Sequence, residues 1–216
     1  MTTPDTARFA DHAFPFDQIE RQRVYDGFRP VDEVTLTHRS LSDGGVLGPM
    51  NRQIMHVGQV AAIIAFDPWR EVMVVIRQFR LGAELALGLG AAVELPAGVV
   101  DPGETLDEAA RRELREETGL EALALAPAYA IMPTPALTDE VAYIFLALVD
   151  SSRLAESAGN SHEHEDIRPM VGTLDDLVAA ADAGRIVNGN LVGALNWFAR
   201  KGRSVAAALA KSLDEE

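Results

Sequence analysis

The chain has 216 residues, enough for one domain of ordinary size or one domain with a smaller appendage. Its 33 acidic and 19 basic residues give a formal net charge of −14, which disfavours nucleic acid and anionic membranes as partners. The chain has no cysteine, which excludes disulfides, thiolate metal sites and a cysteine nucleophile. Its first residues include Asp5 and Asp11 and have no apolar run, which argues against a signal peptide. No stretch is long and apolar enough for a membrane helix. We therefore expect a soluble, cytoplasmic protein.

The N-terminal region predicts a few short strands. Residues 1–20 show no clear periodicity, which indicates a loosely structured start. Residues 24–39 alternate, with Val34 and Leu36 on one face, which favours a half-buried strand closed by a Ser-Asp-Gly-Gly turn. Extended chain resumes at residues 52–57. Because so few short strands are only marginally stable alone, they need the following domain or a second subunit as a partner surface.

From Gly58 onward, strands and helices interleave without a regular βαβ rhythm. Two apolar runs, QVAAIIAF and EVMVVIRQF, predict a buried hairpin, and VELPAG predicts a short strand that runs into a loop. The Gly- and Ala-rich residues 82–92 predict a loop, as do the polar residues 151–160. AYAIMP and VAYIFLALVD predict two further strands.

Three helices are predicted in this second region, at residues 105–118, 173–183 and 190–200. We therefore predict a mixed α/β fold with a sheet between helices. Residues 1–57 form an N-terminal β element in this interpretation, and residues 58–216 form the main domain.

The sequence of the helix at residues 105–118 specifies both of its ends. Thr105 and Glu108 have the spacing of a capping box, and Gly119 stands where a left-handed residue ends a helix. We also expect an apolar row to pack on the sheet, formed by Leu106, Ala110 and Leu114.

The same helix carries a group of carboxylates. Glu113 and Glu117 lie one turn apart, and Glu116 lies beside them. Such like charges repel unless a hard divalent cation with oxygen ligands binds between them. Arg112 has the spacing to bridge Glu108 and Glu116. The alternative is an ordinary solvated, salt-bridged helix face.

The spacing of the residues around this helix matches a known signature in full. Its nine fixed positions are Gly98, Glu104, Arg112, Glu113, Leu114, Glu116, Glu117, Gly119 and Leu120. The chain therefore resembles the Nudix hydrolases. This resemblance implies a Nudix-type α/β/α sandwich with a mixed sheet, preceded here by the small N-terminal antiparallel β element.

The resemblance also implies roles for the signature residues. The ligands of Mg²⁺, with Mn²⁺ as an alternative, would be Glu113, Glu116, Glu117 and the backbone carbonyl of Ala97. Glu104 would be a supporting carboxylate, and the tight turn at Gly98 would shape the loop. Arg112 would hold the carboxylates in place, and with Glu116 it counts among the catalytic residues.

Residues 25–200 look like the ADP-ribose pyrophosphatase branch of that family. About fifteen residues past the signature, this branch has a segment that resembles S-P-G-x-x-x-E. Pro135 and Glu140 fit this pattern, whereas Ala136 replaces the usual glycine. The resemblance makes Glu140 the general base and Pro135 a substrate-binding residue. A plain polar loop is the alternative for Glu140.

Further substrate contacts follow from the same resemblance. An arginine of VVIRQFR contacts phosphate, and the role falls on Arg80, with Arg77 as the second candidate. Phe28 is the candidate platform for the base, with an ordinary core phenylalanine as the alternative. Arg52 resembles an arginine that reaches into a partner subunit's site, and Val99 is a further substrate-binding candidate.

In the family, the N-terminal strands are exchanged between two protomers, so we expect a homodimer. Glu94 is typical of the branch, and Glu165 in the acidic segment EHEDI is expected to face the site. For His162 and His164, exposed loop positions are favoured over a metal site.

The expected reaction is hydrolysis of ADP-ribose to AMP and ribose 5-phosphate. One alternative is hydrolysis of GDP-mannose or another nucleotide sugar. A sensor that binds ADP-ribose without cleaving it is less favoured, because every signature carboxylate is present.

Overall fold

The computed structural model describes residues 6–159 and 165–213, and it has the predicted α/β class. Contacts divide the chain into two units. The N-terminal unit comprises Met1–His56 together with Ala136–Asp139, and the main unit comprises Val57–Pro135 together with Glu140–Glu216. No helix among the described residues is long and apolar enough to cross a bilayer.

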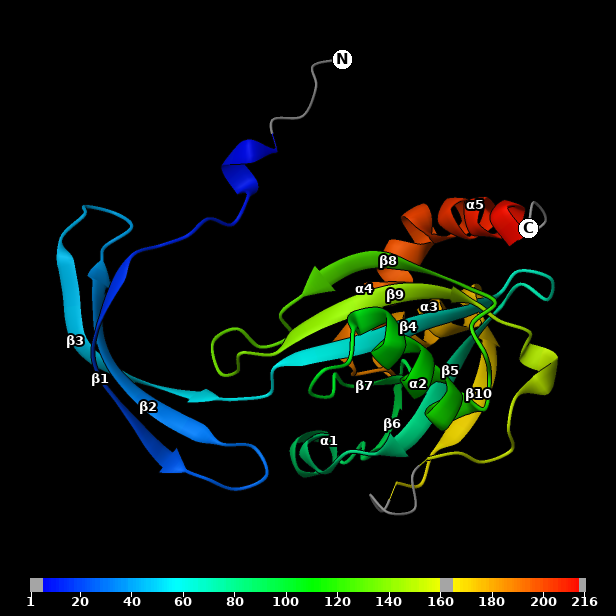
Figure 1. Ribbon diagram of the computed structural model, residues 1–216, viewed down its shortest axis with the longest axis horizontal. Helices are drawn as coiled ribbons and strands as arrows, with labels where there is room; N and C mark the ends of the chain where they lie inside the picture. Colours follow the sequence, from blue (N-terminus) through cyan, green and yellow to red (C-terminus); the bar gives the residue numbers. More distant parts are fainter. Residues whose placement is uncertain (1–5, 160–164, 214–216) are drawn as a thin grey trace. The chain divides into compact units, whose positions relative to one another are not determined.

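The N-terminal unit is an antiparallel sheet in the order β1-β2-β3, after the short 3-10 turn η1 (Ala7–Phe9) (Figure 1). Its strands are β1 (Phe16–Tyr25), β2 (Val31–Arg39) and β3 (Val46–Met55). The prediction of a loosely structured start was wrong for β1, which pairs with β2. Every residue of β1 is exposed, so β1 lacks the alternation of apolar and polar residues that identifies a half-buried strand.

A short segment from much later in the chain belongs to the N-terminal unit. The Met55 N–H donates to the Leu137 carbonyl at 2.9 Å, and the Asp139 N–H donates to the Met55 carbonyl at 3.2 Å. Met55 and Thr138 thereby form a parallel bridge. The segment that precedes Glu140 is therefore bonded to the end of β3.

The main unit contains a seven-stranded mixed sheet with the path β10-β5-β4-β9-β8. β6 pairs with β5, β7 pairs with β4, and β4 and β9 are parallel. The strands are β4 (Gln59–Asp67), β5 (Val72–Phe79), β6 (Ala91–Glu94), β7 (Ala97–Val99), β8 (Ala124–Ile131), β9 (Val141–Leu148) and β10 (Arg168–Thr173). The predicted hairpin corresponds to β4 and β5, which pair antiparallel.

Helices lie on both faces of this sheet, as the sandwich prediction requires (Figure 1). They are α1 (Leu81–Leu87), α2 (Leu106–Thr118), α3 (Leu174–Asp182), α4 (Gly189–Trp197) and α5 (Arg203–Leu213), with a π-helical turn at Phe198–Gly202. Alternate residues of β4 serve two cores because successive side chains point to opposite faces. Ile63 packs with Ala110 and Leu114 of α2, whereas Ile64 packs with residues of α3, α4 and α5.

Several local predictions need correction. Residues 82–92 are not a loop, because α1 occupies much of this stretch and β6 follows. Leucine and alanine favour a helix there, and Gly88 ends it with a left-handed φ of 68°. β10 and α5 were not predicted, and the polar residues 151–160 begin with the 3-10 turn η2 (Ser151–Arg153).

Candidate metal and catalytic site

Helix α2 forms as its sequence predicts. The Glu108 N–H donates to the Thr105 hydroxyl, and the Glu108 carboxylate accepts from the Thr105 N–H at 2.8 Å, which completes the capping box. Gly119 follows with a left-handed φ of 73°. On the sheet side, Ala110 and Leu114 are fully buried. The helix therefore has fixed ends and a fixed inner face, which orients its carboxylates.

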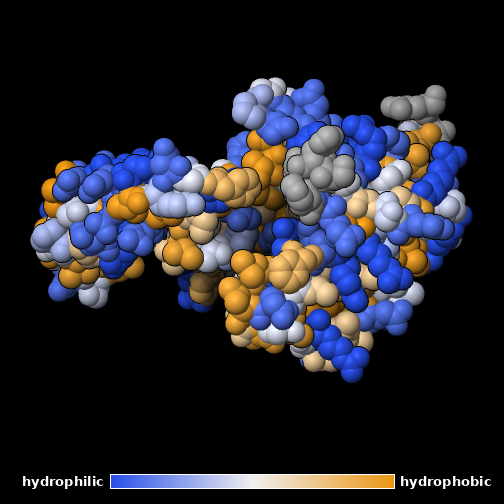
Figure 2. All heavy atoms as spheres, turned by 90° about the horizontal axis from the view of Figure 1, so that it is seen from below, coloured by the Kyte–Doolittle hydropathy of each residue, from blue (hydrophilic) through white to orange (hydrophobic). Residues whose placement is uncertain are grey.

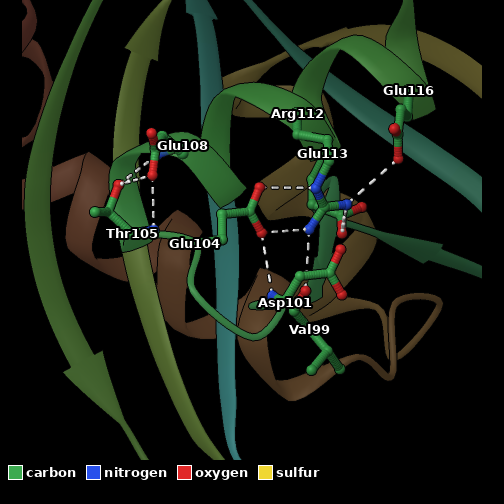
Figure 3. A network of polar contacts seen from close by, with 8 residues as sticks. All are labelled: Val99, Asp101, Glu104, Thr105, Glu108, Arg112, Glu113 and Glu116. Carbon is green, nitrogen blue, oxygen red and sulfur yellow. Dashed lines mark hydrogen bonds and ion pairs between the residues drawn. The ribbon is translucent and has the colours of Figure 1, made fainter.

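Arg112 is the centre of the polar network on α2 (Figure 3). Its Nε and Nη2 atoms donate to both oxygens of Glu104, each at 2.9 Å. Nη2 also donates to the Val99 carbonyl at 3.1 Å. Nη1 donates to Glu113 at 2.6 Å and lies 3.4 Å from Glu116. One guanidinium thus joins the helix, the loop before it and strand β7.

One predicted contact of Arg112 does not form. Glu108 accepts from the backbone and the hydroxyl of Thr105 instead, at 2.8 Å and 2.7 Å. The capping box holds this carboxylate at the helix start, so it is turned away from Arg112. Glu104, outside the helix, takes the place that the (i, i+4) spacing assigned to Glu108.

Gly98 lies directly against the carboxylate of Glu113. A Cβ atom at this position would meet the Glu113 Oε1 atom at 1.9 Å. We predicted that this glycine allows a tight turn, but it lies in strand β7. The missing side chain serves the close approach of the Glu113 carboxylate to the β7 backbone.

Glu113 and Glu117 are both buried, with exposed fractions of 8% and 3%. Burial raises the pKa of Glu117 to about 9. The Ala97 N–H, which donates to Glu117 at 2.7 Å, and the charge of Arg80 act in the opposite direction, whereas Glu113 and Glu165 add repulsion. Burial likewise raises the pKa of Glu113, against the effect of Arg112. Glu165 therefore lies within electrostatic reach of both carboxylates.

This donor set fits a hard divalent cation by its chemistry. Glu113 and Glu117 offer carboxylate oxygens one helical turn apart, and burial disfavours their charged forms unless a positive partner binds between them. Glu116 points to Arg112, and 43% of its side chain is exposed. Among residues 6–159 and 165–213, no three acidic or histidine side chains already surround one point.

Arg80 lies beside these carboxylates, anchored by Glu94. Its guanidinium donates to the buried Glu94 carboxylate, at 2.9 Å from Nε and 2.8 Å from Nη2. Burial lowers the pKa of Arg80, but the bond to Glu94 and the charges of Glu117 and Glu165 raise it above its ordinary value. Arg77 is exposed on β5. Of the two candidate arginines, Arg80 is thus the one close to the acidic residues.

Sequence reasoning missed Asn188 and Gln78, which also hold Glu94. The Asn188 amide donates to Glu94 at 2.9 Å, and Gln78 donates at 3.3 Å. Asn188 is the N-cap of α4 and accepts from the Leu191 N–H at 2.9 Å. The sequence could have shown that cap, but not a contact with a residue 94 positions away.

Glu140 is half-buried and directly precedes β9. Within β4, Val60 pairs with Val99 on one side and with Ala142 on the other. The start of β9 is therefore two strand spacings from β7, or roughly 10 Å. Glu140 and the signature loop lie at the same end of the sheet. Pro135 is exposed.

The remaining predicted site residues lie in the N-terminal unit or outside the described residues. Phe28 is 89% exposed, so the alternative of an ordinary core position was wrong. Arg52 is exposed on β3 and donates to the Asn51 carbonyl at 2.8 Å. His162 and His164 lie outside the described residues.

Comparisons with known proteins bear on this site. The model of the NUDIX domain family matches residues 55–191. An ADP-ribose pyrophosphatase of Escherichia coli is 32% identical over 198 residues, covering 92% of this chain and 94% of that protein. A GDP-mannose pyrophosphatase of Citrobacter koseri is 29% identical over 148 residues, covering 68% and 76%. The crystal structure of an ADP compounds hydrolase has a TM-score of 0.67 at 20% identity, covers 90% of this chain and 100% of its own, and shows a similar fold.

Proposed function

Because this chain belongs to the Nudix hydrolase family, we propose that it hydrolyses the pyrophosphate of ADP-ribose, with Mg²⁺ or Mn²⁺, to AMP and ribose 5-phosphate. The observation that carries this proposal is the pair of buried carboxylates, Glu113 and Glu117, with Arg80 close by. An acidic pair suits a divalent cation, and an arginine beside it suits a phosphate. The similarity to ADP-ribose pyrophosphatases covers nearly the whole chain, which supports this substrate class.

In this proposal, the cation is held by Glu113, Glu116, Glu117 and the Ala97 carbonyl. When bound, it supplies a lowered pKa for water and neutralisation of phosphate charge. Arg112 keeps Glu113 and the Val99 backbone in register, through the bonds described above.

The remaining groups act on the water and on the phosphate. Glu140 accepts the proton of the attacking water. Arg80 pairs with a phosphate oxygen, and its bonds to Glu94 fix the guanidinium in one orientation while 48% of the side chain stays exposed. Val99 and Pro135 contact the substrate in this proposal, and Phe28 stacks on the base.

The active form in this proposal is a homodimer, to which Arg52 contributes by reaching into the partner's site. The N-terminal unit exposes many large apolar side chains, and Figure 2 shows such groups at the surface. They include Phe9, Phe14, Phe16, Ile19, Val24, Tyr25, Leu41, Val46 and Leu47. A sheet with so much exposed apolar surface is stabilised when a second copy covers it. Sedimentation of a monomer at micromolar concentration would contradict the dimer.

GDP-mannose is the second candidate substrate, favoured by the similarity to a GDP-mannose pyrophosphatase over 68% of the chain. The two substrates differ in the base and in the sugar, whereas the pyrophosphate and the site that cleaves it are shared. Phe28 can stack on either base because every base has an aromatic face.

Product analysis tests the proposed substrate. The chain is incubated with Mg²⁺ and either ADP-ribose or GDP-mannose, and products are separated by chromatography. We expect AMP and ribose 5-phosphate, with kcat/KM at least tenfold above that for GDP-mannose, or about 1.4 kcal/mol of discrimination. The opposite preference would keep the metal helix and reject ADP-ribose, and no cleavage of either substrate would contradict the proposed reaction.

A further inference from the structure

At the end of β3, His56 lies between two carboxylates. Its Nδ1 atom is 2.6 Å from the Asp139 carboxylate, and its Nε2 atom is 3.0 Å from the Asp32 carboxylate. Asp32 is 24 residues away in sequence and Asp139 is 83 residues away. The imidazole therefore joins β2 to the segment Ala136–Asp139, and both carboxylates belong to the N-terminal unit.

Asp32 is the fixed end of this chain of contacts. It is only 2% exposed, although it lies in a sheet whose first strand is fully exposed. Arg23 and Arg21 on β1 both donate to it. These two arginines, with Arg23 first, and His56 hold the pKa of Asp32 well below its usual range, against the effect of burial. The ionised form of Asp32 is therefore favoured, and the Nε2 atom of His56 lies against it.

Asp139 is the other end of this chain of contacts, and its backbone is bonded to β3. The Asp139 N–H donates to the Met55 carbonyl, and Met55 donates to Leu137. The side-chain contact with His56 and these backbone bonds hold this segment against the end of β3. The next residue along the chain is Glu140.

We propose that His56 is a positioning residue, which holds the segment Ala136–Asp139 on β3 and thereby restrains Glu140 for its part in the reaction. This inference rests on the proposed function only for the role of Glu140. The contacts themselves are independent of any substrate. Glu140 follows the held segment directly and precedes β9, so a shift of Asp139 is passed along the backbone to Glu140.

The charge of His56 strengthens this contact. The bond to Asp139, and then that to Asp32, raise the pKa of His56 above its ordinary value of 6.5, while burial acts in the opposite direction. A raised pKa means that the stabilisation is complete below 6.5 and declines as the pH rises through the folded-state pKa. Arg21 lies 3.2 Å from Nε2 and can donate to the neutral ring.

The charged groups around His56 are therefore Asp32, Asp139 and Arg21, with Arg23 and Asp26 behind Asp32. In the neutral ring, Nδ1–H still donates to Asp139, but without charge on the donor. Because a hydrogen bond to an ionised carboxylate is already charge-assisted, the bond to Asp139 persists when the ring loses its charge, and the segment is loosened rather than released at high pH.

The test compares His56→Gln, Asp139→Asn and the double variant with the wild type. His38→Gln is the matched control, since His38 is a half-buried histidine of the same sheet whose ring contacts the adjacent Arg39 carbonyl and the ring of Phe14. With ADP-ribose and Mg²⁺, we expect kcat to fall about tenfold in each single variant, the effect of one lost charge-assisted hydrogen bond, while KM changes less than about twofold. The double variant should be no worse than either single one.

Two further readouts separate positioning from general destabilisation. Hydrogen exchange of peptides that contain Ala136–Asp139 should quicken in His56→Gln but not in His38→Gln, with exchange in the main unit unchanged. The ratio of wild-type to His56→Gln kcat should be larger below pH 6.5 than well above it.

Unchanged exchange in this segment, or additive effects in the double variant, would overturn the inference. A lower kcat together with a lower melting temperature and faster exchange throughout the chain would also overturn it, because His56 would then serve stability alone. Failure of the wild type to cleave ADP-ribose would reject the proposed function, and the exchange experiment would still decide whether His56 holds the segment.

Discussion

Gly98 shows how a single missing side chain shapes the site. The three atoms nearest to an added Cβ all belong to the Glu113 carboxyl group, at 1.9–2.6 Å. These atoms are at the end of a flexible side chain, so an added methyl group displaces the carboxylate rather than the backbone. The absence of a side chain at Gly98 therefore affects the position of the Glu113 carboxylate more than the stability of β7.

Gly98→Ala should lower activity while the fold persists. We expect the Mg²⁺ concentration for half-maximal activity to rise by about tenfold or more, because one carboxylate is displaced. Gly82→Ala is the control, since Gly82 has nothing within 4 Å of an added Cβ. Metal titrations of activity and thermal melts check both variants, and an unchanged metal requirement in Gly98→Ala would contradict this account of Glu113.

Like Gly98, Arg112 occupies a position where we expect even a similar residue to impair the site. It serves Glu104, Val99 and Glu113 through three separate nitrogens of one planar group. Arg112→Lys offers a single ammonium, so we expect kcat/KM to fall by about 10- to 100-fold. Arg111→Lys, on the same helix and bonded to Asp107 and the Ala122 carbonyl, should lose less than about threefold. Equal losses in steady-state assays of the two variants would be inconsistent with the central role of Arg112.

Among the elements, the turn after β4 depends on one buried carboxylate. Asp67 accepts from the backbone N–H groups of Trp69 and Arg70, each at 3.0 Å. It also accepts from the side chain of Arg70 and from the backbone and hydroxyl of Ser151, at 2.9, 2.9 and 2.6 Å. Burial alone would raise the pKa of Asp67, but these donors outweigh it and lower the pKa to about 2.

This lowered pKa predicts an acid-sensitive contribution to stability. The contribution is complete above the ordinary value of 3.8 and is lost as the pH falls through about 2. The difference between the ordinary pKa of 3.8 and the lowered pKa of Asp67 corresponds to about 2 kcal/mol in the free energy of unfolding. Denaturant unfolding at several pH values should show Asp67→Asn less stable at neutral pH, with part of the acid dependence removed. The exposed Asp182→Asn should behave as the wild type, and an identical acid dependence in Asp67→Asn would refute the assignment.

At the scale of the whole molecule, the signature helix was the part best predicted from sequence. Its caps and its apolar row depend on neighbours within a turn or two, as the Thr105–Glu108 bonds show. The Arg112–Glu108 bridge was predicted wrongly because a residue outside the helix, Glu104, competes for the arginine. Local spacing specifies an element well but does not specify which of several acids a long side chain will contact.

Contacts between distant parts of the chain were beyond such reasoning. Asn188 reaches Glu94, and His56 reaches Asp139, only because the sheet order brings them together. Strand β1 was missed because it is exposed on both faces and shows no alternation. The general fold class and the family of the chain were nevertheless predicted correctly.

The most direct test of the proposed chemistry is the turnover of ADP-ribose against Mg²⁺ concentration in three proteins: the wild type, Glu117→Gln and Glu121→Gln. Glu117 is buried beside Glu113, whereas the Glu121 side chain is 67% exposed beyond the end of the same helix. We predict metal-dependent turnover in the wild type and Glu121→Gln, and a loss of at least about 100-fold in Glu117→Gln with its melting transition retained. Normal turnover in Glu117→Gln would contradict the metal assignment and with it the proposed mechanism.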